Sequence, residues 1–266
     1  MSASTLAGTA VQLDAGRVIR DGFAVVRRRW PTFLACALVI AALNAGASLL
    51  TAALQASAQA GARPELANTL AMLSGLFLYL AVYVLVLQPL ALNVMSWTAW
   101  ADATGAPADL ASAAGVVGRR AVRLLLTNLV LIVILVVGFL CLVIPGFWLS
   151  VVLAVILPAS VVENLGPQGA LLRSAELTRG QRWRIFVFGI LTGVMAIGAS
   201  FVLGLAALIF GLNINDPANP VAVTLSAIEQ GLLSALIAAL TGSLYAELVR
   251  LKDGGAGPQA TAEVFA

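Results

Sequence analysis

The sequence contains no histidine among its 266 residues, and it is poor in charge. The missing imidazole excludes a histidine general base, a histidine metal ligand and an imidazole pH sensor within this chain. Charged residues make up 10% of the sequence and hydrophobic residues 61%. Because soluble domains contain about 25% charged residues, this composition is typical of a protein that crosses a membrane several times, and we expect one folded unit.

Cysteine is also scarce, since the chain has only Cys36 and Cys141. Two cysteines make no disulfide framework, and both lie in apolar runs, where we interpret them as small buried hydrophobic side chains. The sequence shows no nucleophile beside a base, no metal-ligand cluster and no phosphate-binding loop. We therefore predict a protein that is not an enzyme and that requires no cofactor or metal.

Six apolar runs predict membrane-spanning helices. They cover residues 31–55, from Thr69 to about Trp97, 121–143, 147–162, 185–210 and 221–246. With this arrangement, fourteen of the fifteen lysine and arginine residues fall on one side, the exception being Arg63. The positive-inside rule places that side and both termini in the cytoplasm. We expect a multi-pass protein of the bacterial inner membrane, with Trp148 on the opposite side and no nucleic acid partner.

Amphipathic stretches precede the three pairs of spans, at residues 13–30, 107–118 and 166–180. A basic amphipathic helix with an aromatic anchor is typical of the membrane surface. The predicted fold is therefore an all-α membrane protein with six transmembrane helices as three hairpins, each preceded by an amphipathic cytoplasmic interfacial helix. The membrane domain covers residues 13–252, and we expect disorder at 1–12 and 253–266.

The stretch between the fourth and fifth spans is the most polar in the chain. Gly166-Pro167 predicts a helix start, because proline at the first helical position gives up a donor that has no partner there. Gly180 predicts the helix end. One arc of this helix carries Ala170, Leu171, Ser174, Leu177 and Thr178, and the opposite arc carries Arg173, Glu176 and Arg179. Arg182-Trp183-Arg184 then predicts a point of membrane entry.

An internal repeat is suggested by the recurrence of this layout in units at about 13–100, 105–163 and 166–248. Residues 16–33 align without gaps on residues 169–186. The alignment matches Gly16 with Gly169, Arg20 with Arg173, Arg29 with Arg182, Trp30 with Trp183, and Phe33 with Phe186. The middle unit keeps the layout but not the residues.

A longer motif accompanies the polar stretch. It runs from Pro158 through Glu163, Leu165-Gly166-Pro167, Ala170-Leu171, Arg173-Ser174 and Leu177-Thr178-Arg179-Gly180 to Trp183, after a turn at Ile144-Pro145-Gly146. This motif resembles the bacterial glycerophosphoryl diester phosphodiesterase membrane-domain family, a group of uncharacterised six-span proteins. The resemblance implies a membrane location and a similar layout over residues 12–250. It implies no activity, because we expect no catalytic phosphodiesterase domain here and that chemistry resembles a histidine-dependent hydrolysis.

The arginine-rich cytoplasmic face is the first candidate site. Candidate contacts for anionic lipid of the inner leaflet or for a protein partner are Arg28, Arg29, Trp30, Arg173, Arg179, Arg182, Trp183 and Arg184. Each cation near an anionic leaflet contributes about 1 kcal/mol. The alternative is that these arginines only set the topology and interact with helix ends. A role in envelope or lipid homeostasis would fit lipid binding.

The second candidate site is a polar group inside the predicted spans. Glu229 lies near the middle of the last span, where an unpaired carboxylate is costly, and we expect hydrogen bonds from Gln230, Asn44 or Gln88. This acid supports an alternative function, a transporter or channel for a small solute or lipid in which Glu229 takes up a proton. Contribution to helix packing is the other interpretation.

Small residues and prolines predict how the spans pack. The last span carries Ala227, Gly231, Ala235, Ala239 and Ser243 at four-residue spacing. This stripe predicts close packing of the fifth and sixth spans, with homodimerisation as the alternative. Pro89 and Pro158 predict kinks in their helices.

Overall fold

The computed structural model describes residues 13–59, 66–211 and 219–253, and in these ranges the regular structure is helical without strands. Six segments are long and apolar enough to cross a membrane: Trp30–Ala53, Leu73–Thr104, Leu110–Cys141, Val143–Val162, Arg182–Ile209 and Pro220–Lys252. The chain is therefore an all-α, multi-pass membrane protein. The expected disordered ends, except Asp253, lie outside the described residues, as does Arg63.

The last helix, α10 (Pro220–Lys252), is the most buried of the six segments. It packs against α1 (Ala15–Arg28), α2 (Trp30–Gln59) and α4 (Gln88–Thr104). A Cβ added to Gly231 would lie 2.3 Å from the carbonyl oxygen of Ala37, and one added to Gly242 would lie 2.6 Å from that of Ser96. Two backbones can approach this closely only where the side chain is a hydrogen atom.

The predicted small-residue stripe of α10 is buried along its length, from Ala227 to Ser243. Its partners differ from the prediction. We expected the stripe to pack against the fifth span, which is α9 (Arg182–Ile209), but α10 packs mainly on α2 and α4 and touches α9 little. Period and residue size identify a packing face, but they do not identify the helix that covers it.

Both prolines change their helices more than a simple bend would. Before Pro89, the second span changes from α3 (Leu66–Val82) to a π-helical turn (Tyr83–Leu87), because proline has no N–H for the regular ladder. Near Pro158, the fourth span divides into α6 (Val143–Val152) and α7 (Ile156–Val162). The proline ring clashes with the carbonyl four residues earlier, so a helix cannot continue unbroken through it.

The middle interfacial helix expected at residues 107–118 is not a separate helix. Asp109 caps a single helix, α5, which runs from Leu110 to Cys141. Its glycines at 115 and 118 have helical neighbours on both sides and do not break it. The chain then turns at the extended residue Leu142, so Pro145-Gly146 lies inside α6 rather than forming the turn.

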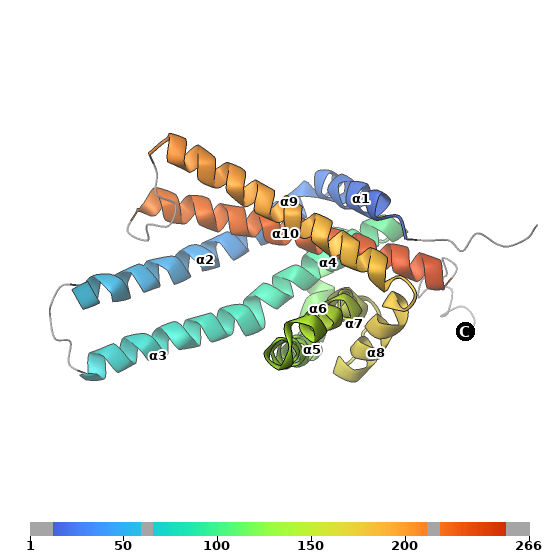
Figure 1. Cartoon of the computed structure of the whole chain (residues 1–266), viewed down its shortest axis with the longest axis horizontal. Helices are drawn as coiled ribbons and strands as arrows, with labels where there is room; N and C mark the ends of the chain where they lie inside the picture. Colours follow the sequence, from blue (N-terminus) through green and yellow to red (C-terminus); the bar gives the residue numbers. More distant parts are fainter. Residues whose placement is uncertain (1–12, 60–65, 212–218, 254–266) are drawn as a thin grey trace, which may run out of the picture.

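Figure 1 shows α5 almost end-on, while α2, α3, α4 and α10 run across the view. α5 and α6 pack against each other, with the rings of Phe139 and Phe147 5.5 Å apart. α5 therefore crosses the other long helices steeply. The predicted arrangement of the six spans as three hairpins is not confirmed.

α1 buries part of the apolar face that the sequence predicts for residues 13–30, which comprises Ile19, Gly22, Phe23, Val26 and Trp30. Val18, Gly22 and Val25 are buried against the bundle, with Gly22 close to Leu240 of α10. Ile19 and Val26 of the predicted face also pack against the core, whereas Phe23 and Trp30 are 45% and 59% exposed. α1 therefore packs on α10 and leaves Phe23 exposed, and Trp30, the first residue of α2, is exposed as well.

Candidate functional site

The polar stretch folds as α8 (Pro167–Thr178), with Pro167 at its start and Gly180 beyond its end at φ 85°. Both boundaries match the sequence prediction. Ser174 donates a 2.8 Å hydrogen bond to the carbonyl of Val152, and Thr178 donates a longer one of 3.4 Å. That carbonyl lies where α6 ends before the turn to α7, so α8 satisfies an acceptor that the broken helix leaves open. α8 thus runs back alongside α7.

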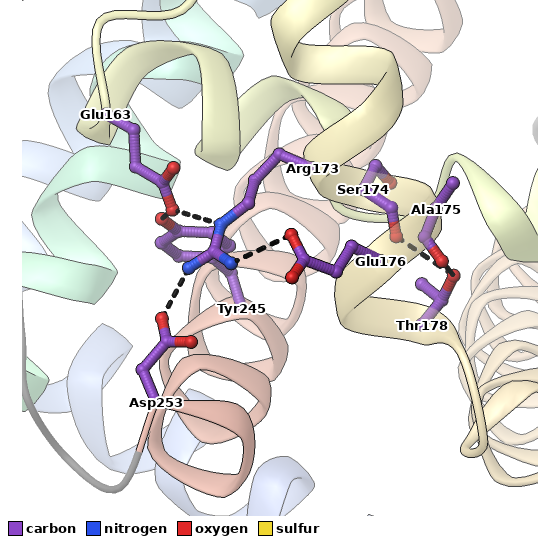
Figure 2. Close-up of polar contacts among 8 residues, drawn as sticks. All are labelled: Glu163, Arg173, Ser174, Ala175, Glu176, Thr178, Tyr245 and Asp253. Atoms are coloured by element: carbon purple, nitrogen blue, oxygen red, sulfur yellow. Dashed lines mark hydrogen bonds and ion pairs between the residues drawn. The ribbon is translucent and has the colours of Figure 1, made fainter.

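Arg173 lies at the centre of a cluster that joins three helices (Figure 2). We call it the Arg173 cluster, and its members are Glu163, Arg173, Glu176, Tyr245 and Asp253. Arg173 Nε donates to Glu163 Oε1 at 2.8 Å, Nη1 to Glu176 Oε2 at 3.2 Å, and Nη2 to Asp253. The hydroxyl of Tyr245 donates to the same Glu163 oxygen at 2.7 Å. The cluster therefore ties α8 to the end of α7 and to the end of α10.

The charge on Arg173 is strongly favoured in this position. Burial lowers the pKa of Arg173, but hydrogen bonds to Glu163 and Asp253 outweigh burial and raise the pKa above its ordinary value. The side chain is 18% exposed. Asp253, expected in a disordered tail, instead belongs to this cluster.

Two arginines of α5 hold the loop that follows α7. Arg120 donates to the carbonyls of Val161 and Val162, and Arg123 donates to the carbonyl of Asn164 at 2.6 Å. Asn164 has φ 54°, a left-handed conformation that asparagine tolerates better than most residues. These bonds fix the position of Glu163, which the Arg173 cluster requires.

Most of the predicted lipid-binding arginines also have partners inside the chain. Arg28 and Arg29 each form a 2.8 Å ion pair with Asp102, whose side chain is 6% exposed. Arg184 donates to the carbonyl of Leu13 at 2.6 Å. These contacts attach α1 to α4 and to the start of α9.

Arg182 has a different environment. Its guanidinium lies over the ring of Trp148, 4.9 Å from the centroid, and its Nε is covered but has no hydrogen-bond partner among the described residues. We expected Trp148 on the opposite side of the membrane, and this contact shows that expectation to be wrong. The prediction assumed one straight helix over the fourth span, but the helix is broken by a turn at residues 153–155, between α6 and α7. Nearby, Arg179 is exposed and Trp183 is 74% exposed.

Two apolar cavities lie along α9, and Arg182 lines the first of them. The first, about 590 Å³, lies between α6 and α9, and its lining includes Trp148, Arg182, Trp183 and Ile190. The second, about 470 Å³, continues along α9 and reaches α10. The two share Phe147, Val151, Phe186 and Ile190. Both volumes lie in the range of about 300–1,000 Å³ typical of small-ligand sites.

The intramembrane polar group does not form as expected. Asn44 donates to the hydroxyl of Tyr83 at 2.9 Å and to the carbonyl of Ile40 at 3.0 Å. Glu229 is half-buried and forms no hydrogen bond with Asn44, Gln88 or Gln230, all of which are described. It lines none of the five cavities found in the described part of the chain. Two residues after Glu229, Gly231 lies in the close contact between α10 and α2.

Sequence reasoning missed Glu163, Tyr245, Asp253 and Trp148 as functional neighbours. The sequence could have indicated that the acids Glu163 and Asp253 have partners, because charged residues are rare in this chain and a buried charge requires a partner. No local sequence pattern predicts the contact between Glu163 and Tyr245, which are 82 residues apart. No group of three or more potential metal ligands occurs among the residues described.

Comparison with known proteins gives one finding. A family model described as a domain of unknown function (DUF7847) matches residues 103–248, more than half of the chain. No curated protein and no solved structure matches.

Proposed function

We propose that this chain, which belongs to the DUF7847 family, is a non-catalytic integral protein of the bacterial inner membrane. Its arginine-rich cytoplasmic face binds anionic lipid. Such binding would serve envelope or lipid homeostasis. A protein partner or a second copy of the chain on the same face is the other form of this proposal.

The observation that supports it is the contrast among the arginines. Arg173 pairs with three carboxylates, which compensate its charge fully. Arg28 and Arg29 share the single carboxylate of Asp102, which compensates half of their combined charge. Arg179 and Arg182 form no ion pair within the described residues, and Trp183 between α8 and the apolar length of α9 is exposed. Cations beside an exposed tryptophan at the start of an apolar helix are typical of the headgroup region.

Lipid retention tests the proposal directly. The full chain is purified in mild detergent, mixed with equal amounts of phosphatidylglycerol and phosphatidylcholine, and the lipids that remain are quantified by mass spectrometry. We expect phosphatidylglycerol to be preferred, and the double variant Arg179→Gln/Arg182→Gln to reduce the preference severalfold, at about 1 kcal/mol per cation. Arg63→Gln, the cation expected on the opposite side, is the matched control. Equal retention of the two lipids by the unaltered chain would contradict the proposal.

Transport remains the alternative function. Its support is the half-buried carboxylate of Glu229 within an apolar segment, since acids in such positions often belong to proton relays. Uptake of a protonated solute that Glu229→Gln abolishes would favour it. The resemblance to the phosphodiesterase membrane-domain family also remains a proposal, and it supports a location rather than an activity.

A further inference from the structure

The groove between α6 and α9 combines one cation with a long apolar surface. Arg182 lies at its start, and the lining residues further along α9 include Phe186, Ile190 and Gly193. From Arg182 to Ala196, where the second cavity ends on this helix, α9 advances about 20 Å at 1.5 Å per residue. The polarity therefore changes from cationic to apolar in one direction, as it does along a lipid molecule.

The chemistry of Arg182 specifies the headgroup. The guanidinium carbon of Arg182 lies 4.9 Å from the centroid of the Trp148 ring, and a guanidinium can donate two parallel hydrogen bonds to a phosphate. Nε lacks a partner in the described part of the chain, and buried polar atoms are seldom left without one. No carboxylate lines either cavity, so the charge at this position favours an anion.

We infer that this groove is a specific site for one anionic glycerophospholipid, with the phosphate on Arg182 and an acyl chain between α6, α9 and α10. The inference rests on the proposed function and assigns it a defined site. It differs from general attraction of anionic lipid to the face, because the acyl chain is held between helices and the lipid is retained in a fixed ratio to the protein.

The glycines of α9 supply a sharp test of the groove. Gly189 and Gly193 line the second cavity, and a Cβ added to either meets no atom within 4 Å. Leucine at both positions should therefore fill the groove without disturbing the backbone. Gly198 lies on the same helix, also has open space at its Cβ, and lines neither cavity. Gly198→Leu is the matched control.

Native mass spectrometry of the full chain with phosphatidylglycerol should show one lipid that survives collisional activation after the others leave. We expect Gly189→Leu/Gly193→Leu to reduce its occupancy at least fivefold and Gly198→Leu to leave it unchanged. Arg182→Gln should lower the occupancy about fivefold and remove the discrimination against phosphatidylcholine, whereas Arg63→Gln, the cation expected on the opposite side, should not. The Arg182→Gln variant tests the site independently, because it removes the cation and leaves the groove open.

The outcomes separate the site from the general function. If the retained lipid is unaffected by Gly189→Leu/Gly193→Leu, or if phosphatidylcholine is retained equally by the unaltered chain, the groove assignment is wrong. The exchangeable lipids report separately on the proposed function, because their preference for phosphatidylglycerol should persist in the leucine variant. Loss of the single retained lipid with persistence of that preference supports both statements, and absence of any preference in the unaltered chain overturns the function itself.

Discussion

Arg173 and Arg182 lie on consecutive helices, and their environments are opposite. Arg173 bonds to three carboxylates and is largely covered, whereas Arg182 stacks on an indole beside an apolar cavity. Both were predicted from the sequence as lipid contacts, because the pattern of cations shows which side they share but not which of them is neutralised. The structure supplies that distinction through Glu163 and Asp253.

Replacing Arg173 tests its structural role. Arg173→Gln leaves Glu163 and Asp253 without their cation, and we expect a loss of about 1–3 kcal/mol in the free energy of unfolding, the cost of unsatisfied, mostly buried polar groups. Thermal unfolding followed by circular dichroism in detergent measures it. Arg179→Gln, on the exposed last turn of the same polar stretch, should leave the melting temperature unchanged. Equal melting temperatures for both variants would show that the Arg173 cluster contributes no stability.

At the scale of helices, the boundaries that depend on local chemistry could be predicted. Pro167 starts α8, Gly180 follows its end, and the six apolar segments occur where the hydropathy places them. The partners of each helix could not be predicted. Trp148 contacts Arg182, and α10 packs on α2. Both contacts join segments that are far apart in the sequence, and a local periodicity does not predict such contacts. The fusion of residues 110–118 into α5 was missed because an arginine cluster was taken as a helix boundary.

The packing of α10 on α2 predicts a sharp difference between glycines. Gly231→Ala places a methyl group against the Ala37 carbonyl, and overpacking of this kind costs about 1–3 kcal/mol. Gly198→Ala meets open space, so it should be neutral or raise stability by up to about 1 kcal/mol through helix propensity. Melting temperatures of the two variants provide the comparison. A Gly231→Ala protein as stable as the Gly198→Ala protein would contradict the close contact.

At the scale of the whole molecule, the arginine contacts gather near the ends of α1, α4, α7, α8 and α10. Arg28 joins α1 to α4, Arg123 joins α5 to the loop after α7, and Arg173 joins α8 to α10. Charges in an apolar chain thus connect the helices. Under the proposed function, Arg179 and Arg182, which form no ion pair among the described residues, are among the cations that contact lipid. This division of the cations requires that the side they share faces the anionic cytoplasmic leaflet.

Orientation in the membrane is the most direct test of that requirement. A cysteine introduced as Arg179→Cys, in a chain with Cys36→Ala and Cys141→Ala, is reacted with a membrane-impermeant maleimide in sealed vesicles of defined sidedness. Asn213→Cys, in the segment between α9 and α10, reports on the other side. We predict that the residue 179 cysteine reacts only in inside-out vesicles and the residue 213 cysteine only in right-side-out vesicles. Reaction at residue 179 in right-side-out vesicles would contradict the account.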